Sequence, residues 1–296
     1  MLAALPRKVK IVDVSLRDGL QNVSGPVIST ADKKKFFDLL LAAGLTDFEV
    51  TSFVSPGRIP QLGDAEAFYS LIAAHEDRGM RLAALVPNEK QLARAIQCQV
   101  KTIALFTSPS DTFNRKNINR DVASSLKDIE TVARAAAAHG MNIRGLISMV
   151  FGCPDEGKID ESLLMKIIER FLSLNAYEVV LSDTVGVAGP GQVHELTGKV
   201  KERFGLDKIV LHCHDTRGIA VANVLAALDA GISIFDASTG GLGGCPFARG
   251  ARGNVATEDL VYLFNTLGID CGVDLEALEK AAELILSKTG NQCQAE

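Results

Sequence analysis

The stretch Lys208-Ile-Val-Leu-His-Cys-His-Asp-Thr216 is a short apolar run that ends in two histidines and a polar turn. Such a run is typical of a strand that is buried on both faces of a parallel sheet. Because strand side chains alternate, His212 and His214 should share one face and Cys213 should occupy the other. Two imidazoles spaced ~6–7 Å apart along a strand can bind one metal ion, although such a pair alone is equally often structural.

The same pattern recurs along the chain, where short β-branched runs alternate with longer amphipathic segments. Strands are expected at 9–16, 47–52, 81–86, 101–106, 142–150, 178–182, 208–214 and 233–237. Helical patterns between them include 30–43, 121–139, 161–174, 191–203 and 218–230. About eight strand–helix units in ~250 residues predict an α/β TIM (β/α)8 barrel rather than a doubly wound sheet.

The pattern also predicts how the chain is divided. We expect a barrel at about 8–269 and an additional C-terminal helix at about 270–288 that caps it. No linker rich in Pro, Gly or Ser interrupts the pattern, so residues 1–296 are interpreted as a single catalytic domain.

Composition narrows the class of protein. The chain has 296 residues, 47% of them hydrophobic, and a net charge of −5 without a basic cluster, which argues against a nucleic-acid partner. Neither a signal peptide nor a run of ~20 apolar residues is evident, so we expect no membrane partner and a cytoplasmic location. Six scattered cysteines without a paired spacing indicate reduced thiols.

In a TIM barrel the chemistry lies at the carboxyl ends of the strands. Most of the charged or ligand-capable residues in the apolar runs fall at these ends: Arg17, Asp18 and Gln21 after the first, Glu49 and Ser52 after the second, Asp183 after the sixth, and His212 and His214 at the seventh. A glycine-rich loop, 240–254, follows the eighth. A random scatter of polar residues would not favour one rim.

These residues predict a metal site. Asp18, His212, His214 and the amide oxygen of Asn254 form a mixed oxygen and nitrogen set, which suits a divalent cation such as Mg²⁺ or Mn²⁺ better than a structural zinc ion. Asp18 on its own would more often be a turn or capping residue. Its expected place opposite the histidines favours a ligand.

Two neighbouring residues could act on the substrate. Arg17 could neutralise an oxyanion beside the metal, and a salt bridge to Glu49 or Asp183 would not exclude this role. The loop 240–254 lacks the pattern of a phosphate-binding loop. It is interpreted as a mobile lid, because its six glycines in fifteen residues leave it poor in side chains and free in φ/ψ. Cys245 in this loop is a candidate acid or base.

Several motifs together resemble the 3-hydroxy-3-methylglutaryl-CoA lyases, a family of TIM-barrel metallolyases, over residues 9 to 288. The motifs are Arg17-Asp-Gly-Leu-Gln-Asn22, Thr51-Ser-Phe-Val-Ser-Pro56, Lys116-Asn-Ile-Asn119, Gly152-Cys-Pro154, Glu156-Gly-Lys158, Asp183-Thr-Val-Gly-Val187, His212-Cys-His-Asp-Thr216 and Gly241-Leu-Gly-Gly-Cys-Pro246. The cysteine loop is the most specific of them, since the related synthases lack this thiol.

The resemblance implies an enzyme that binds a divalent ion through Asp18, His212, His214 and Asn254. It implies Arg17 at the enolate oxygen and Cys245 in proton transfer. The remaining implied site residues are Glu49 and Asp183 as supporting acids, His212 also as a catalytic group, Glu258 behind the metal site, and Gln21 and Ser52 near the substrate.

The implied reaction is a retro-Claisen cleavage of a 3-hydroxy-3-methylglutaryl-CoA-like acyl-CoA into acetyl-CoA and acetoacetate, as in leucine degradation and ketone-body metabolism. A homo-oligomer, dimeric or larger, is also expected. A condensing synthase or a 2-oxo-acid aldolase of the same superfamily is the alternative, and a non-catalytic binding barrel is disfavoured because all four ligands are present.

The chain departs from the family pattern around the substrate. The departures are Val23-Ser24, Gly57-Arg58, the loop Thr107-Ser-Pro-Ser-Asp111, Met149, and Val180 with Ser182, where the family favours Ser and Gly. The metal and catalytic residues are intact. The preferred acyl group is therefore left open, and a group other than methyl is a candidate.

Overall fold

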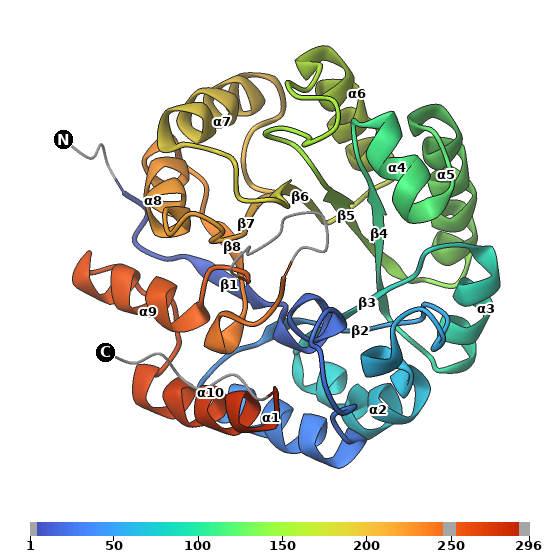
Figure 1. Cartoon of the computed structure of the whole chain (residues 1–296), viewed down its shortest axis with the longest axis vertical. Coiled ribbons are helices and arrows are strands. Elements are labelled where there is room, and N and C mark those ends of the chain that lie inside the picture. The colour runs from blue at the N-terminus through green and yellow to red at the C-terminus, as the bar shows by residue number, and fades with distance from the viewer. Residues whose placement is uncertain (1–4, 245–252, 290–296) are drawn as a thin grey trace.

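A computed structural model describes residues 5–244 and 253–289 and contains a closed barrel of parallel strands inside a ring of helices (Figure 1). The strands are β1 (Lys10–Asp13), β2 (Asp47–Ser52), β3 (Arg81–Leu85), β4 (Thr102–Thr107), β5 (Asn142–Ile147), β6 (Glu178–Asp183), β7 (Ile209–Cys213) and β8 (Ile234–Ala237). Each strand pairs with the next in the sequence, and β8 closes the barrel on β1. The expected TIM barrel is therefore confirmed.

The helices follow the strands around the outside of the barrel. They are α1 (Thr30–Ala42), α2 (Ala65–Ile72), α3 (Glu89–Gln97), α4 (Asp111–Ile118), α5 (Val122–Ala138), α6 (Glu161–Ser173), α7 (Pro190–Phe204), α8 (Ala220–Ala230), α9 (Thr257–Thr266) and α10 (Leu275–Thr289). Shorter turns are the π-helix η1 (Ser15–Gly19) and the 3-10 helices η2 (Pro60–Leu62), η3 (Ala73–Arg78) and η4 (Thr239–Gly241).

Local sequence explains where many of these helices begin. Ser29, Asn88, Ser110, Asp121 and Asp160 each precede a helix, and each side chain accepts a hydrogen bond from a backbone N–H of the first turn. Such caps satisfy donors that have no partner inside the helix. Each cap therefore fixes the point at which a loop turns into a helix.

The first strand is shorter than expected, and this difference shapes the site. The sequence predicted a strand at 9–16, but β1 ends at Asp13. The Asp13 carboxylate accepts the N–H of Ser15 at 3.0 Å, and the chain then turns into the buried π-helix η1. On a strand Arg17 and Asp18 would point to opposite faces, whereas this turn allows both to reach the barrel mouth.

The C-terminal helix also begins later than expected. The predicted segment was 270–288, and α10 covers Leu275–Thr289. Residues before it form a turn in which the Asp270 side chain accepts the N–H of Gly272, whose φ of 70° is left-handed. Helix α10 packs against α1 and α9, so it covers the side of the barrel next to them (Figure 1).

The interior of the barrel contains an apolar cluster and a group of buried charges. The apolar cluster consists of Val12, Leu85, Ala104, Leu146, Val180, Val210 and Ile234. The charged group is Glu49, Arg144, Glu178 and Asp236, none more than 3% exposed. Arg144 forms salt bridges to all three of these acids.

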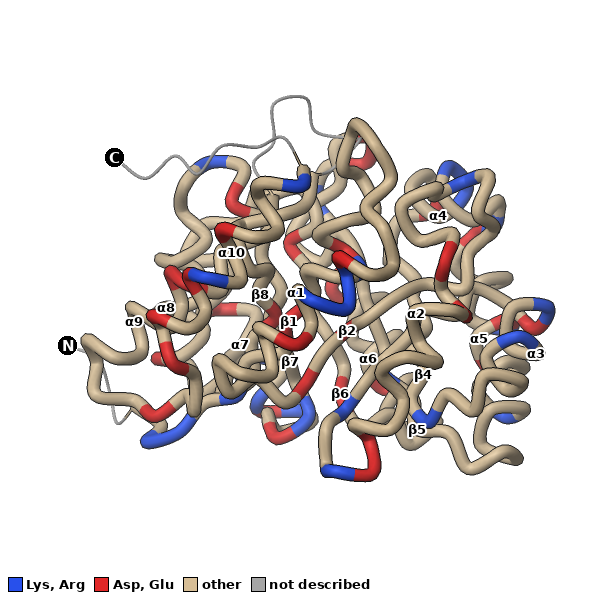
Figure 2. The backbone as a smooth tube through the Cα atoms, turned by 90° about the horizontal axis from the view of Figure 1, so that it is seen from below, with Lys and Arg blue, Asp and Glu red and all other residues tan. Residues whose placement is uncertain are grey.

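Charges of both signs are distributed along the chain. Figure 2 shows basic and acidic residues interspersed over the described part of the chain. Among the described helices, none is long and apolar enough to cross a membrane.

The contact between β5 and α6 gives a test of the packing. Gly145 of β5 lies against Phe171 of α6, and a Cβ at residue 145 would lie 2.5 Å from the Phe171 ring. The ring is fully buried and has little room to move. We expect Gly145→Ala to lower the free energy of unfolding by about 1–3 kcal/mol in denaturant unfolding, as overpacked cores do.

Gly198→Ala is the matched control. Gly198 lies inside α7, and a Cβ there would meet no atom within 4 Å. Alanine should raise the free energy of unfolding by about 0.5–1 kcal/mol, because glycine loses more backbone freedom in a helix. Equal effects of the two substitutions would contradict the packing argument.

Candidate metal and catalytic site

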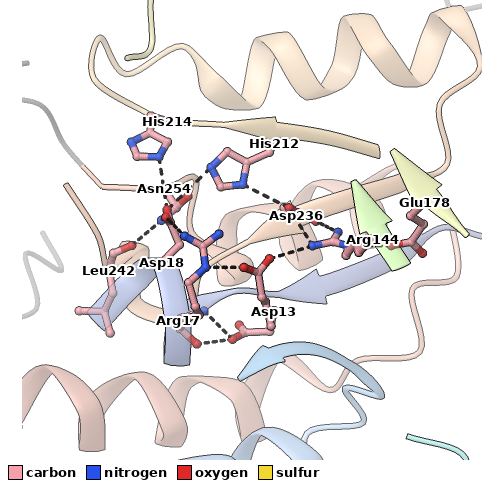
Figure 3. A network of polar contacts seen from close by, with 12 residues as sticks. Asp13, Arg17, Asp18, Arg144, Glu178, His212, His214, Asp236, Leu242 and Asn254 are labelled. Carbon is pink, nitrogen blue, oxygen red and sulfur yellow. Dashed lines mark hydrogen bonds and ion pairs between the residues drawn. The ribbon is translucent and has the colours of Figure 1, made fainter. Parts of the chain in front are cut away.

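Three buried side chains that could hold a metal ion meet at the barrel mouth. Asp18 comes from η1, His212 from β7, and His214 directly follows β7. One ligand atom from each lies within 4.8 Å of the others. Figure 3 shows contacts from both imidazoles to Asp18. The structure thus brings Asp18 together with the two histidines across the barrel.

The distances within this cluster are short. Asp18 Oδ2 lies 3.5 Å from His214 Nε2 and 3.9 Å from His212 Nε2. The two imidazole rings are 5.2 Å apart between centroids. All three side chains can therefore reach one ion without a change of backbone.

Asn254, the expected fourth ligand, contacts Asp18 and keeps one polar atom without a partner. Its Nδ2 donates to Asp18 Oδ2 and to the carbonyl oxygen of Leu242, both at 3.0 Å. Its Oδ1 is buried without a hydrogen-bond partner, as is Nδ1 of His214. Burying an unpaired polar atom costs free energy, so Oδ1 is a natural fourth ligand atom. One carboxylate, one amide oxygen and two imidazoles fit Mg²⁺, Mn²⁺ or a similar ion.

A second carboxylate orients His212. Nδ1 of His212 lies 3.2 Å from Asp236 Oδ2, and Asp236 is in turn salt-bridged to Arg144. Burial alone raises the pKa of Asp236, but the charge of Arg144 and the contact with His212 lower it below its usual value. An ionised Asp236 holds a proton on Nδ1, which leaves Nε2 facing Asp18.

Arg17 is held by two acids at the edge of the cluster. Nε donates to Glu49 Oε1, and Nη1 donates to Asp18 Oδ1 at 2.6 Å. Burial alone lowers the pKa of Arg17, but Glu49 and Asp18 raise it above its usual value. Burial raises the pKa of Asp18, whereas Arg17, His214 and His212 lower it well below its usual value. Both side chains are therefore charged and fixed in orientation.

The expected substrate residues differ in their placement. Gln21 lies in the site, where Nε2 donates to Asp18 Oδ1 at 2.7 Å. Ser52 is fully buried, and its Oγ accepts the N–H of Val54 at 3.2 Å. Gln21 thus contacts Asp18 of the candidate metal site directly, whereas Ser52 supports the turn after β2.

The side-chain carboxylates of Asp183 and Glu258 accept hydrogen bonds from backbone N–H groups. The Asp183 carboxylate accepts the N–H groups of Val187 and Ala188, both at 3.0 Å. The Glu258 carboxylate accepts the N–H of Gly240 at 2.8 Å, and burial raises its pKa to about 7. Each acid holds a loop that borders the site.

Cys245 and most of the expected lid lie outside the described residues, which stop at Gly244 and resume at Gly253. Gly244 itself contacts the segment 17–22, since its carbonyl oxygen accepts a hydrogen bond from the side-chain N–H of Asn22 at 2.7 Å.

Sequence reasoning missed Asp236 and Arg144. Both lie inside strands, β8 and β5, rather than at strand ends. A charge within an otherwise apolar strand was the available signal, because such a charge must be paired inside the barrel.

A cavity of about 710 Å³ opens above the cluster. It is lined on one side by Arg17, Asp18 and the two histidines, and on another by apolar residues from β3 to β6: Leu85, Leu105, Phe106, Leu146 and Val180. Of the departures from the family pattern, Val180, Ser182 and Arg58 line this cavity. Its volume is in the range of small-molecule sites.

The described geometry agrees with three comparisons to known proteins. A family model named HMGL-like matches residues 8–285. The chain is 41% identical over 284 residues to human mitochondrial hydroxymethylglutaryl-CoA lyase, covering 96% of this chain and 86% of the human protein. It is 43% identical over 287 residues to a 3-hydroxy-3-isohexenylglutaryl-CoA/hydroxymethylglutaryl-CoA lyase of Pseudomonas aeruginosa, covering 97% and 94%.

A solved structure extends the likeness to three dimensions. The HMG-CoA lyase of Bacillus subtilis superposes with a TM-score of 0.94 at 40% identity, covering 99% of this chain and 98% of the other. The family match, both relatives and this structure each span nearly the whole chain. The chain belongs to the HMGL-like family.

Proposed function

We propose that this chain is a divalent-metal-dependent carbon–carbon lyase that cleaves 3-hydroxy-3-methylglutaryl-CoA, or a close analogue, into acetyl-CoA and acetoacetate by a retro-Claisen reaction. The observation that carries the proposal is the convergence of Asp18, His212 and His214 beside Arg17 at the barrel mouth. The names of the human and Pseudomonas aeruginosa relatives support the same reaction.

The four residues Asp18, His212, His214 and Asn254 would hold Mg²⁺ or Mn²⁺, which supplies Lewis acidity that lowers the pKa of the substrate hydroxyl. His212 suits this role because Nδ1 is taken by Asp236 and Nε2 faces Asp18. The same nitrogen cannot bind an ion and carry a proton at once. We therefore assign His212 as a ligand rather than as the base.

Arg17 would stabilise the charge that appears when the carbon–carbon bond breaks. The substrate hydroxyl loses its proton to a base, the hydroxyl carbon becomes a ketone, and the electron pair of the broken carbon–carbon bond moves onto the acetyl-CoA part as an enolate. Glu49 and Asp18 hold Nε and Nη1 of Arg17, so the guanidinium is oriented before the charge develops. Arg17 also lines the cavity in which the substrate would bind.

The remaining roles rest on the sequence and on the contacts of the supporting acids. Cys245 is proposed to deliver the proton that converts the enolate to acetyl-CoA. Asp183 and Glu258 are proposed to hold the loops around the site through their backbone contacts. We infer a cytoplasmic homo-oligomer that acts in leucine degradation or ketone-body metabolism.

The first test of the function is metal dependence. Acetyl-CoA release from 3-hydroxy-3-methylglutaryl-CoA should disappear after exhaustive chelation and return when Mg²⁺ or Mn²⁺ is added. Asp18→Asn should weaken metal binding by at least about 100-fold, because it removes a charged ligand. Asp38→Asn, on the exposed face of α1, is the control and should leave metal binding and turnover unchanged. Full activity after chelation would contradict the proposal.

The second test separates Arg17 from the metal ligands. We expect Arg17→Met to lower kcat and kcat/KM by similar factors of about 10²–10³, because the charge that it stabilises exists only after bond breaking begins. The bound metal should remain. Arg134→Met, at a side chain that is 77% exposed on α5, serves as the control. A rise in KM with unchanged kcat would instead make Arg17 a substrate-binding residue.

The third test concerns the acyl group. Ser182 pairs in register with His212 and lines the cavity, so a substituent on the carbon that carries the reacting hydroxyl would lie near it. Ser182→Gly removes this side chain. The ratio of kcat/KM for a longer 3-alkyl analogue to that for the methyl compound should rise by about tenfold or more, as expected for methylene-sized changes. An unchanged ratio would show that Ser182 does not limit the acyl group.

A further inference from the structure

Arg144 lies inside the barrel, below the candidate metal site (Figure 3). Among the described residues, its side-chain hydrogen bonds go to three acids and not to Arg17 or a proposed metal ligand. It is fully buried on β5 and is surrounded by acids from three other strands. Nε donates to Glu178 at 2.9 Å, Nη1 donates to Glu49 at 3.2 Å, and Nη2 donates to Asp236. The buried guanidinium thus joins β2, β6 and β8.

Two of these acids have a second contact that leads into the site. Asp236 Oδ2 meets Nδ1 of His212 at 3.2 Å. Glu49 accepts a hydrogen bond from Arg144 on Oε2 and another from Arg17 on Oε1. Figure 3 shows the line of contacts from His212 through Asp236 to Arg144. One guanidinium therefore holds both Asp236, which contacts the proposed ligand His212, and Glu49, which contacts Arg17.

The third acid leads away from the site. Glu178 Oε1 meets Nζ of Lys10, the first residue of β1, at the opposite end of the barrel. Glu178 is as deeply buried as Asp236 and pairs with the same guanidinium. It therefore provides an internal comparison for the loss of one salt bridge to Arg144.

We propose that Arg144 is a positioning residue that sets the orientation of His212 through Asp236 and of Arg17 through Glu49. This inference rests on the metal site and the Arg17 role proposed above. A guanidinium is planar and its N–H groups point in fixed directions, so it fixes the two carboxylates relative to each other. Neutralising the acids would need only a positive charge, whereas orienting them needs this shape.

Arg144→Lys distinguishes the two roles, because lysine keeps the charge and loses the planar fork. We expect the dissociation constant for Mn²⁺, measured by equilibrium dialysis on the full chain, to rise by about 10–100-fold, as for other residues that orient metal ligands. We also expect kcat to fall while KM changes little. Thermal unfolding and circular dichroism would establish that the variant is folded.

Substitutions of the acids around Arg144 separate its effect on His212 from its effect on Arg17. Asp236→Asn should weaken Mn²⁺ binding by a similar factor, because it loosens His212. Glu49→Gln should leave Mn²⁺ binding within about threefold and lower kcat, because Glu49 holds Arg17 directly, whereas Asp236 keeps its own contacts with Arg144 and His212. Glu178→Gln is the matched control, since it removes a salt bridge to Arg144 while the contacts of Asp236 with His212 and of Glu49 with Arg17 are left in place. It should lower stability but change neither Mn²⁺ binding nor kcat by more than about threefold.

The outcomes decide between the proposals. A folded Arg144→Lys protein that binds Mn²⁺ as well as the parent would overturn the positioning role and leave the metal site intact. If Arg144→Lys does not fold, the Asp236 and Glu178 variants decide: equal losses of Mn²⁺ affinity would reduce Arg144 to a structural residue, and a loss confined to Asp236→Asn would support the inference. A parent protein that fails to bind Mn²⁺ would overturn both the metal site and this inference.

Discussion

Buried charge is the constraint on which the site depends. A charged side chain that has lost its water needs an oppositely charged partner, and removing one partner of a buried pair costs about 3–5 kcal/mol. The barrel meets this constraint with an alternating series of acids and bases: Asp18, Arg17, Glu49, Arg144, Asp236 and His212. Each interior member has a partner on either side. The geometry of the reacting groups is thereby tied to strands that form the core.

The end of β1 determines how this series starts. Asp13 stops the strand, and its carboxylate also accepts hydrogen bonds from Thr239 and Thr257. It thereby joins the first strand to the segment after β8 and to the start of α9. The turn that follows delivers Arg17 and Asp18, adjacent in the sequence, to the same cavity. A regular strand could not do this, because its side chains alternate between faces.

The sequence predicted the fold because eight apolar runs recur at the spacing of strand–helix units, and the bounds of β2 agree to the residue. It predicted that Arg17, Asp18 and the two histidines lie together, because parallel strands bring their carboxyl ends to one rim. The direction in which each side chain at the strand ends points was not predictable. Ser182 lines the cavity, whereas its neighbour Asp183 points to backbone N–H groups. Arg144 and Asp236 were missed because their pairing joins strands that are 92 residues apart in the chain.

The arrangement also separates the chemistry from the choice of acyl group. The candidate ligands come from η1, from the end of β7 and from the segment before α9, whereas the apolar wall of the cavity comes from β3 to β6. Substitutions in that wall can alter the shape of the cavity while the buried series of charges stays paired. The two regions meet where Ser182 of β6 pairs with His212 of β7. Variation at residue 182 can therefore change the space beside the candidate ligands without removing one of them.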